Sequence, residues 1–181
     1  DAPLDGWVRL AVPAASAALY DAMTGRAGYA RIRPAGDGAV EVYLQMLPGE
    51  SRIVRTYTAE QSGIFWEYLR PAGGATALEG EWTIRFVEGG PTLPAEARTR
   101  TLGSWTDFPG QGVRSFSGSA TYALDFTRPG ESPDAWILDL GAVHQSARVS
   151  LNGVNLGTLI GPVYRVEVPA ELLRERNRLE V

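Results

Sequence analysis

Acidic side chains are the first candidates for chemistry in this sequence, which holds 21 Asp and Glu residues. Two carboxyl groups held roughly 5 to 10 Å apart can hydrolyse a glycosidic bond. Asp125, Asp139 and Glu167, however, fall on the polar phase of strand-like segments, where contact with water is the ordinary interpretation. The acidic residues therefore predict no catalytic pair.

The single histidine, His144, limits the other catalytic chemistries. One histidine excludes a metal site built on a pair of histidines, and it leaves a histidine-based triad resting on one residue. Ser146 and Ser150 follow His144 along the chain without the Gly-x-Ser-x-Gly pattern of a nucleophile elbow. We expect a loop or strand-edge histidine, and no catalytic residue in this chain.

Cation and phosphate sites have little support in the sequence. Asp37, Asp107 and Asp134 are isolated, and no calcium-binding run of alternating acids is present. We expect no cofactor and no metal ligands, although a structural calcium ion held by loop carboxylates stays open. The sequence has no lysine, which excludes the Gly-x-x-x-x-Gly-Lys loop that binds phosphates.

Tryptophans point to sugar recognition, because aromatic faces pack against the C–H side of a pyranose ring. Trp82 and Trp136 share the phase of inward residues and are predicted to lie in the core. Another tryptophan lies in "LGSWTDFPGQG", which has the composition of a loop. The candidate carbohydrate-binding residues of this loop region are Trp105, Asp107, Phe108 and Arg114. The alternative, in which Trp105 only anchors the loop, stays open.

The elements that must position these residues are β-strands, because alternation with period two dominates the sequence. Val40, Val42 and Leu44 share one face of a predicted strand, and residues 28–46 are predicted to form a hairpin around a Gly/Asp-rich turn. Asn152-Gly153 predicts a second hairpin with a two-residue turn. The segment "PAELLRERN" predicts one or two helical turns.

Many short strands at spacings near ten residues predict an all-β fold, an antiparallel sandwich or jelly roll. Pro and Gly interrupt the alternation in "RPAGGATALEG", residues 70–80. We therefore expect two segments, a β-rich segment at 1–75 and a sandwich at 76–181. The chain starts and stops within strand-like phrases, so we expect it to be cut at both ends.

Composition narrows the classes of partner. The residues are 44% hydrophobic, and no apolar run approaches the ~20 residues needed to cross a bilayer, so we expect no membrane partner. The formal net charge is −4 and the 17 basic residues, all arginine, are scattered, so we expect no nucleic-acid partner. Without cysteine, the sequence gives no redox clue to its compartment.

Three phrases of the second segment resemble the galactose-binding-like jelly roll found as the sugar-binding domain of family 2 glycoside hydrolases. They are "EGEWTIRF", "FSGSATYALDF" and the long ending "WILDLGAVHQSARVSLNGVNLGTLIGPVYRVEVPAELLRERNRLEV". The resemblance implies an antiparallel β-sandwich with this jelly-roll topology, preceded by part of a second β-sandwich.

The whole chain resembles the C-terminal β-sandwich region of the α-L-rhamnosidases of glycoside hydrolase family 106. The phrases that carry this are "DAMTGRAGYA", "VYLQMLPGESRIVRT" and "LGSWTDFPGQGVRSFSGSATY". In such enzymes the catalytic carboxylates lie on an N-terminal (β/α)₈ barrel, which nothing here matches. The resemblance implies that residues 1–75 are the tail of a preceding β-sandwich and that the final residues would lack the family's last strand. The resemblance thus implies a region without catalytic residues in a periplasmic or secreted bacterial enzyme.

The expected function is a non-catalytic ancillary region of a multidomain glycoside hydrolase that acts in polysaccharide degradation. Its expected partners are the catalytic domain of the same parent chain and a plant-type polysaccharide or oligosaccharide. Two alternatives stay open. One is a stand-alone carbohydrate-binding or lectin-like module, and the other is a fragment of a family 2 glycosidase.

Overall fold

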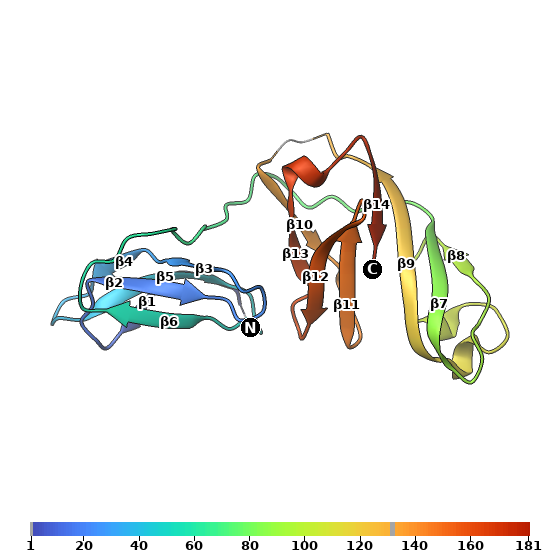
Figure 1. Ribbon diagram of the computed structural model, residues 1–181, viewed down its shortest axis with the longest axis horizontal. Helices are drawn as coiled ribbons and strands as arrows, with labels where there is room; N and C mark the ends of the chain where they lie inside the picture. The colour runs from blue at the N-terminus through green and yellow to red at the C-terminus, as the bar shows by residue number, and fades with distance from the viewer. Residues whose placement is uncertain (1, 131–132) are drawn as a thin grey trace. The chain divides into compact units, whose positions relative to one another are not determined.

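The computed structural model describes residues 2–130 and 133–181, and its regular secondary structure is almost wholly β-strand (Figure 1). Its paired strands run antiparallel apart from one isolated parallel bridge, which confirms the predicted all-β antiparallel fold. The chain divides into two compact units. The first comprises the residues up to Pro71 together with Ile160–Val163, and the second comprises Ala72–Leu159 together with Tyr164–Val181.

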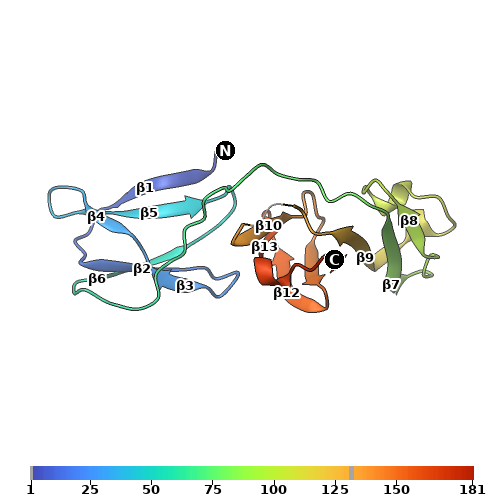
Figure 2. The ribbon, with the colours of Figure 1, turned by 90° about the horizontal axis from the view of Figure 1, so that it is seen from above.

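The first unit is a sandwich of two three-stranded sheets, which Figure 2 shows as two layers. One sheet has the strand order β1-β5-β4 and the other has the order β3-β2-β6. The strands are β1 Leu4–Leu10, β2 Ser16–Tyr20, β3 Ala27–Tyr29, β4 Ile32–Pro34, β5 Val40–Met46 and β6 Ile53–Tyr57.

Aliphatic side chains join the two sheets of the first unit. Leu19 of β2 packs with Val42 and Leu44 of β5, and all three are buried, as the alternation in β5 predicts. The predicted hairpin over residues 28–46 is wrong in its first part, because β3 pairs with β2 in the other sheet and only β4 pairs with β5. The chain crosses from one sheet to the other between β3 and β4. Both sheets bury alternate side chains, so the period-two pattern of the sequence does not reveal this crossing.

The segment after β6 crosses the first unit and is tied to both of its sheets. The amide of Tyr29 donates to the carbonyl of Ile64, and the amide of Trp66 donates to the carbonyl of Tyr29, each at 2.9 Å. The side-chain amide of Gln45 then bonds both backbone groups of Leu69. The exposed edge of β3 is thereby paired, which protects it from edge-to-edge association.

The second unit contains a six-stranded sheet of order β12-β11-β14-β9-β7-β8 and a two-stranded ladder, β10-β13. Its strands are β7 Trp82–Gly90, β8 Ala97–Thr99, β9 Ser117–Thr127, β10 Ala135–Asp139, β11 Ser146–Leu151, β12 Val154–Ile160, β13 Arg165–Pro169 and β14 Arg176–Glu180. Three short 3₁₀ turns connect them: η1 Trp105–Asp107, η2 Val113–Ser115 and η3 Ala170–Leu172.

The core of the second unit lies between these two sets of strands. Trp82, Leu124 and Leu179 of the larger sheet are buried in one cluster with Val168 of β13. Trp136 of β10 packs against the same cluster, so the inward phase predicted for Trp82 and Trp136 is confirmed. The indole N–H of Trp136 is buried and has no hydrogen-bond partner among the described residues.

The predicted Asn152-Gly153 turn joins β11 to β12, and both residues have positive φ angles, 53° and 82°. The side chain of Asn152 also forms hydrogen bonds with neighbouring elements. Its carbonyl oxygen accepts from the Arg178 amide at 2.9 Å, and its NH₂ donates to the Leu172 carbonyl and to the buried Asn177 side chain. The turn is therefore fixed to β14 and to η3.

The segment "PAELLRERN" forms a single 3₁₀ turn after Pro169, the lower end of the one or two helical turns predicted. Pro169 ends β13 and has φ of −57° as the N-cap of η3. Of the helices in residues 2–130 and 133–181, none has the length and apolar character needed to span a bilayer.

Candidate functional site

The four predicted carbohydrate-binding residues lie on or beside two 3₁₀ turns, η1 and η2, that pack against each other. Beneath the turns lies a cluster of buried residues from β7 and the loop, Ile84, Phe86, Val113 and Phe116. Trp105 and Phe108 pack against this cluster and are half-buried. The loop is thus fixed on the sheet by its own aromatic residues.

Trp105 makes edge-to-face contacts with two buried rings. Its ring centroid lies 5.9 Å from that of Phe86 and 5.6 Å from that of Phe116, and the two phenylalanines are 5.0 Å apart. Ser104 caps η1 by accepting a hydrogen bond from the Thr106 amide. This geometry gives Trp105 a role in anchoring the loop, and it leaves only part of the indole exposed for a ligand.

Asp107 and Arg114 differ from the aromatic residues, because their side chains are exposed. Among the described residues, neither side chain forms a hydrogen bond or an ion pair. The structure therefore brings an unpaired carboxylate and an unpaired guanidinium onto two neighbouring turns. These are the group types that bind sugar hydroxyls.

Two glycines explain why Phe116 can lie so close to the sheet. Gly89 of β7 and Gly118 of β9 are register partners. A Cβ atom at Gly89 or Gly118 would lie 2.8 or 2.7 Å from Cζ of Phe116, and it would also overlap the backbone of the opposite strand. Only glycine at both positions leaves room for the ring that supports Trp105.

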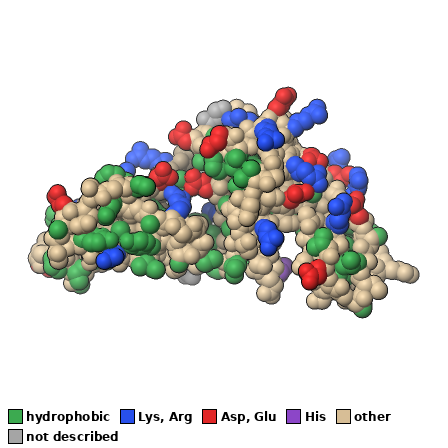
Figure 3. Space-filling view, viewed as in Figure 1, with side chains coloured by type: hydrophobic (Ala, Val, Ile, Leu, Met, Phe, Trp, Pro, Cys, Tyr) green, Lys and Arg blue, Asp and Glu red, His purple; other side chains and the backbone are tan. Residues whose placement is uncertain are grey.

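The acidic residues considered for catalysis lie on open strand faces. Asp125 pairs with Arg178 at 3.3 Å and Asp139 pairs with Arg165 at 2.7 Å, with 75% and 45% of the two acidic side chains exposed. Glu167 lies on β13 on the same face as Asp139. His144 is exposed in the loop before β11. Figure 3 shows arginine and acidic side chains interspersed over β14, β9 and β7.

The described part of the chain holds no group of three or more His, Asp or Glu residues placed to bind a metal ion. Asp37, Asp107 and Asp134, the acids considered for calcium, lie on three separate connections between strands, with Asp107 in η1. The carboxylate of Asp37 is bound by Arg9 at 2.7 and 2.8 Å.

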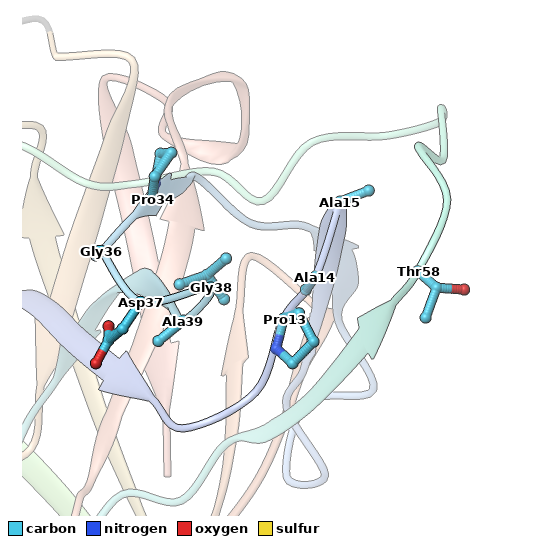
Figure 4. Close-up of a pocket in the computed structure, with 10 residues that line it drawn as sticks. Pro13, Ala14, Ala15, Pro34, Gly36, Asp37, Gly38, Ala39 and Thr58 are labelled. Atoms are coloured by element: carbon cyan, nitrogen blue, oxygen red, sulfur yellow. The ribbon is translucent and has the colours of Figure 1, made fainter.

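A shallow hollow of about 480 Å³ lies in the first unit (Figure 4). Small residues line most of it, and its polar side chains are Asp37 and Thr58. Because the Asp37 carboxylate is held by Arg9, the hollow offers no free acid or base. The one carboxylate that lines the hollow is thus held in an ion pair, and glycoside hydrolysis requires two carboxyl groups.

One cluster was missed by the sequence analysis, on the outward face of the β3-β2-β6 sheet. It contains Tyr20, Tyr29, Tyr57 and Arg55. In "RIVRTYT" the alternation already places Arg55 and Tyr57 on one side of a strand. The signal that was overlooked is that this side carries an aromatic ring and a basic group without an acidic residue.

The known proteins that are similar to this chain include a rhamnosidase and a protein named as a glucuronidase. A solved structure of a rhamnosidase from Novosphingobium sp. PP1Y matches 99% of the chain with a TM-score of 0.74 and 27% sequence identity. A protein of Formosa agariphila named "Putative beta-glucuronidase" is 34% identical over 107 residues, which is 58% of this chain. No protein-family model matches the chain.

The chain covers only a small part of each of these proteins, 17% of the rhamnosidase and 9% of the Formosa protein. The likeness to the rhamnosidase extends over nearly the whole of this chain and includes both units. The chain is therefore similar to one region of a much longer glycoside hydrolase.

Proposed function

We propose that this chain is a non-catalytic β-sandwich region of a multidomain glycoside hydrolase that resembles the family 106 α-L-rhamnosidases. The observation that carries the proposal is the match of 99% of the chain to 17% of a rhamnosidase. Most of that enzyme lies outside the matched region, which leaves room for a catalytic domain in the same parent chain.

The placement of charged groups supports a role without catalysis. Asp125 and Asp139 are each held by an arginine on an open strand face, and His144 is exposed in a loop. Hydrolysis of a glycoside requires an acid and a second carboxylate on opposite sides of the bond. The region would instead support the catalytic domain and contact the polysaccharide substrate.

Within this role, the η1–η2 surface is one proposed contact with carbohydrate. Asp107 and Arg114 would bind sugar hydroxyls, and Trp105 and Phe108 would support the turns that carry them. The exposure of the two charged side chains supports this division of roles. A galactose-binding-like fold for the second unit belongs to the same proposal.

The test compares the complete gene product with the same product lacking these 181 residues, on an aryl α-L-rhamnoside and on a rhamnose-containing polysaccharide. We expect the shortened enzyme to lose stability or polysaccharide hydrolysis while its catalytic residues stay in place. A parent gene that encodes no glycosidase domain would overturn the proposal.

The relative from Formosa agariphila favours a second candidate for the parent activity. Its name and its 34% identity support a parent that acts on β-glucuronides. Assaying the complete gene product on aryl α-L-rhamnoside and aryl β-D-glucuronide in parallel separates the two candidates.

A further inference from the structure

We infer that the outward face of the β3-β2-β6 sheet binds an acidic oligosaccharide, with Arg55 holding a uronate carboxylate beside three tyrosines. The choice of a glycan as ligand rests on the proposed function. The place and the preference for negative charge rest on the geometry of the face. We call this surface, formed by the outward residues Ser16, Ala18, Tyr20, Ala27, Tyr29, Ile53, Arg55 and Tyr57, the tyrosine face.

Two tyrosines lean toward each other across the middle of the tyrosine face. Tyr20 pairs with Ile53, and Tyr57 pairs with Ser16, so the two tyrosines start at opposite ends of the β2-β6 ladder. Their hydroxyl oxygens are nevertheless 3.4 Å apart. The rings must therefore lie along the strands, above Ala18, which is only 5% exposed.

The third tyrosine widens this aromatic surface. Tyr29 is the register partner of Ala18 on the β3 side, and its ring centroid lies 6.3 Å from that of Tyr57. Gly63 lies against the Tyr29 ring, where a Cβ atom would be 2.8 Å from Cε2. Half-buried tyrosines fixed in this way present ring surface and hydroxyl groups together, which suits a pyranose.

Arg55 gives the tyrosine face its charge. It is the only charged residue among the eight outward residues of the face, and it is exposed. Its guanidinium carbon lies 5.1 Å from the Tyr57 ring centroid. Among the described residues, the Arg55 guanidinium has no carboxylate partner. A guanidinium without a counter-ion favours an anionic ligand, and it binds a carboxylate through two parallel hydrogen bonds.

On the outward face of the other sheet in this unit, two arginines are neutralised by acidic side chains of the protein. There Arg9 pairs with Asp37, and Arg33 pairs with Glu41. Asp5 accepts a hydrogen bond of 2.6 Å from the Tyr43 hydroxyl. These four charges already have partners within the protein. On the same face, the exposed Arg31 stacks on Tyr68 and has no carboxylate partner among the described residues, but the face also carries Asp5, Glu41 and the carboxylate bound by Arg9, which the tyrosine face lacks.

The test titrates the complete 181-residue chain with a tetramer of galacturonic acid and, separately, with its methyl ester, by calorimetry or NMR. We expect the free acid to bind and the ester to bind about tenfold more weakly, because one charge-assisted contact is lost. Arg55→Gln should weaken binding of the acid by about the same factor. Tyr57→Ala should also reduce it, and Arg33→Gln is the matched control that should not.

Three outcomes would overturn the inference. One is the absence of binding to the free acid by folded protein, with folding checked by circular dichroism. Another is equal binding of acid and ester. The third is binding that survives Arg55→Gln and disappears with Asp107→Asn and Arg114→Gln. None of these results bears on the rhamnosidase assays of the complete gene product, so the two proposals fail separately.

Discussion

In the second unit Trp82, Phe86 and Phe116 lie inside the sandwich, whereas in the first unit Tyr20, Tyr57 and their neighbours lie on outward sheet faces. The buried core of the first unit is aliphatic and small. Several aromatic rings of the first unit stack with arginines instead. Arg33 lies over the Trp7 ring, and Arg31 lies over the Tyr68 ring.

This difference separates two uses of the same residue types. A buried ring stabilises a fold through the apolar area it removes from water. A ring on an outward face contributes less to stability and is available to a ligand. Substitutions of the buried rings in the second unit should therefore act on stability, and substitutions on the tyrosine face should act on binding.

The largest effect is expected for Phe116→Ala, which removes a ring that is 5% exposed and contacts both Phe86 and Trp105. We expect a loss of about 3 to 5 kcal/mol in the free energy of unfolding. The matched change on the tyrosine face, Tyr57→Ala, should cost less than about 1.5 kcal/mol. Urea unfolding of both variants tests this, and equal losses would remove the contrast between the units.

The next effect concerns a buried ion pair that ties two turns of the first unit together. Asp21, 7% exposed, caps the turn after β2 by accepting from the Met23 amide, and its second oxygen lies 3.4 Å from Arg52. Arg52 also contacts Glu50 at 3.4 Å. The first unit thus contains a largely buried charged network between these two turns.

We expect Asp21→Asn to cost about 3 kcal/mol in unfolding free energy, because a largely buried guanidinium loses one of its two counter-ions while the turn cap is kept. The exposed pair Arg33–Glu41 provides the control, since Arg33→Gln should cost at most about 1 kcal/mol. Thermal melts of the two variants measure this difference. Similar melting temperatures would show that the Asp21–Arg52 pair does not hold the unit together.

A smaller effect separates anchoring from binding on the η1–η2 loop. Trp105→Ala should reduce the unfolding free energy by about 2 kcal/mol, because the half-buried indole packs on two buried rings. Asp107→Asn and Arg114→Gln should each change it by less than about 0.5 kcal/mol. If the loop binds sugar, these two variants weaken glycan binding in a titration without loss of stability. Retained stability in Trp105→Ala would contradict the anchoring role.

The smallest effect is a change in tyrosine titration on the two outward faces of the first unit. The hydrogen bond from Tyr43 to Asp5 raises the pKa of Tyr43, and the hydrogen bond with Tyr20 raises the pKa of Tyr57. A pKa raised in the folded state contributes stability below the unfolded pKa of about 10, and this stability is lost as the pH rises through the folded pKa. Ultraviolet titration of Asp5→Ala should show a lower pKa for Tyr43 and an unchanged one for Tyr57. A shift of both, or of neither, would contradict the separation of the faces.

The sequence predicted the features that depend on neighbouring residues. Alternation reports which side of a strand is buried, so the inward positions of Val42, Trp82 and Trp136 were predicted correctly. The Asn152-Gly153 turn was predicted because its backbone conformation favours those two residues.

Features that depend on which strands pair could not be predicted from the sequence pattern. The chain changes sheets between β3 and β4, which leaves no mark in a pattern of period two. The support of Phe116 by Gly89 and Gly118 requires the register of β7 and β9, including the irregularity between Phe86 and Glu88. The tyrosine face likewise requires β2 to lie between β3 and β6.

The most direct test of the central claim, that this region supports a glycoside hydrolase without catalysing hydrolysis, is an activity assay on the isolated 181-residue chain. The folded chain would be incubated at high concentration with an aryl α-L-rhamnoside and an aryl β-D-glucuronide, beside the complete gene product. The account predicts release of the aryl group by the complete product alone. Turnover by the isolated chain that follows the protein through purification would contradict it.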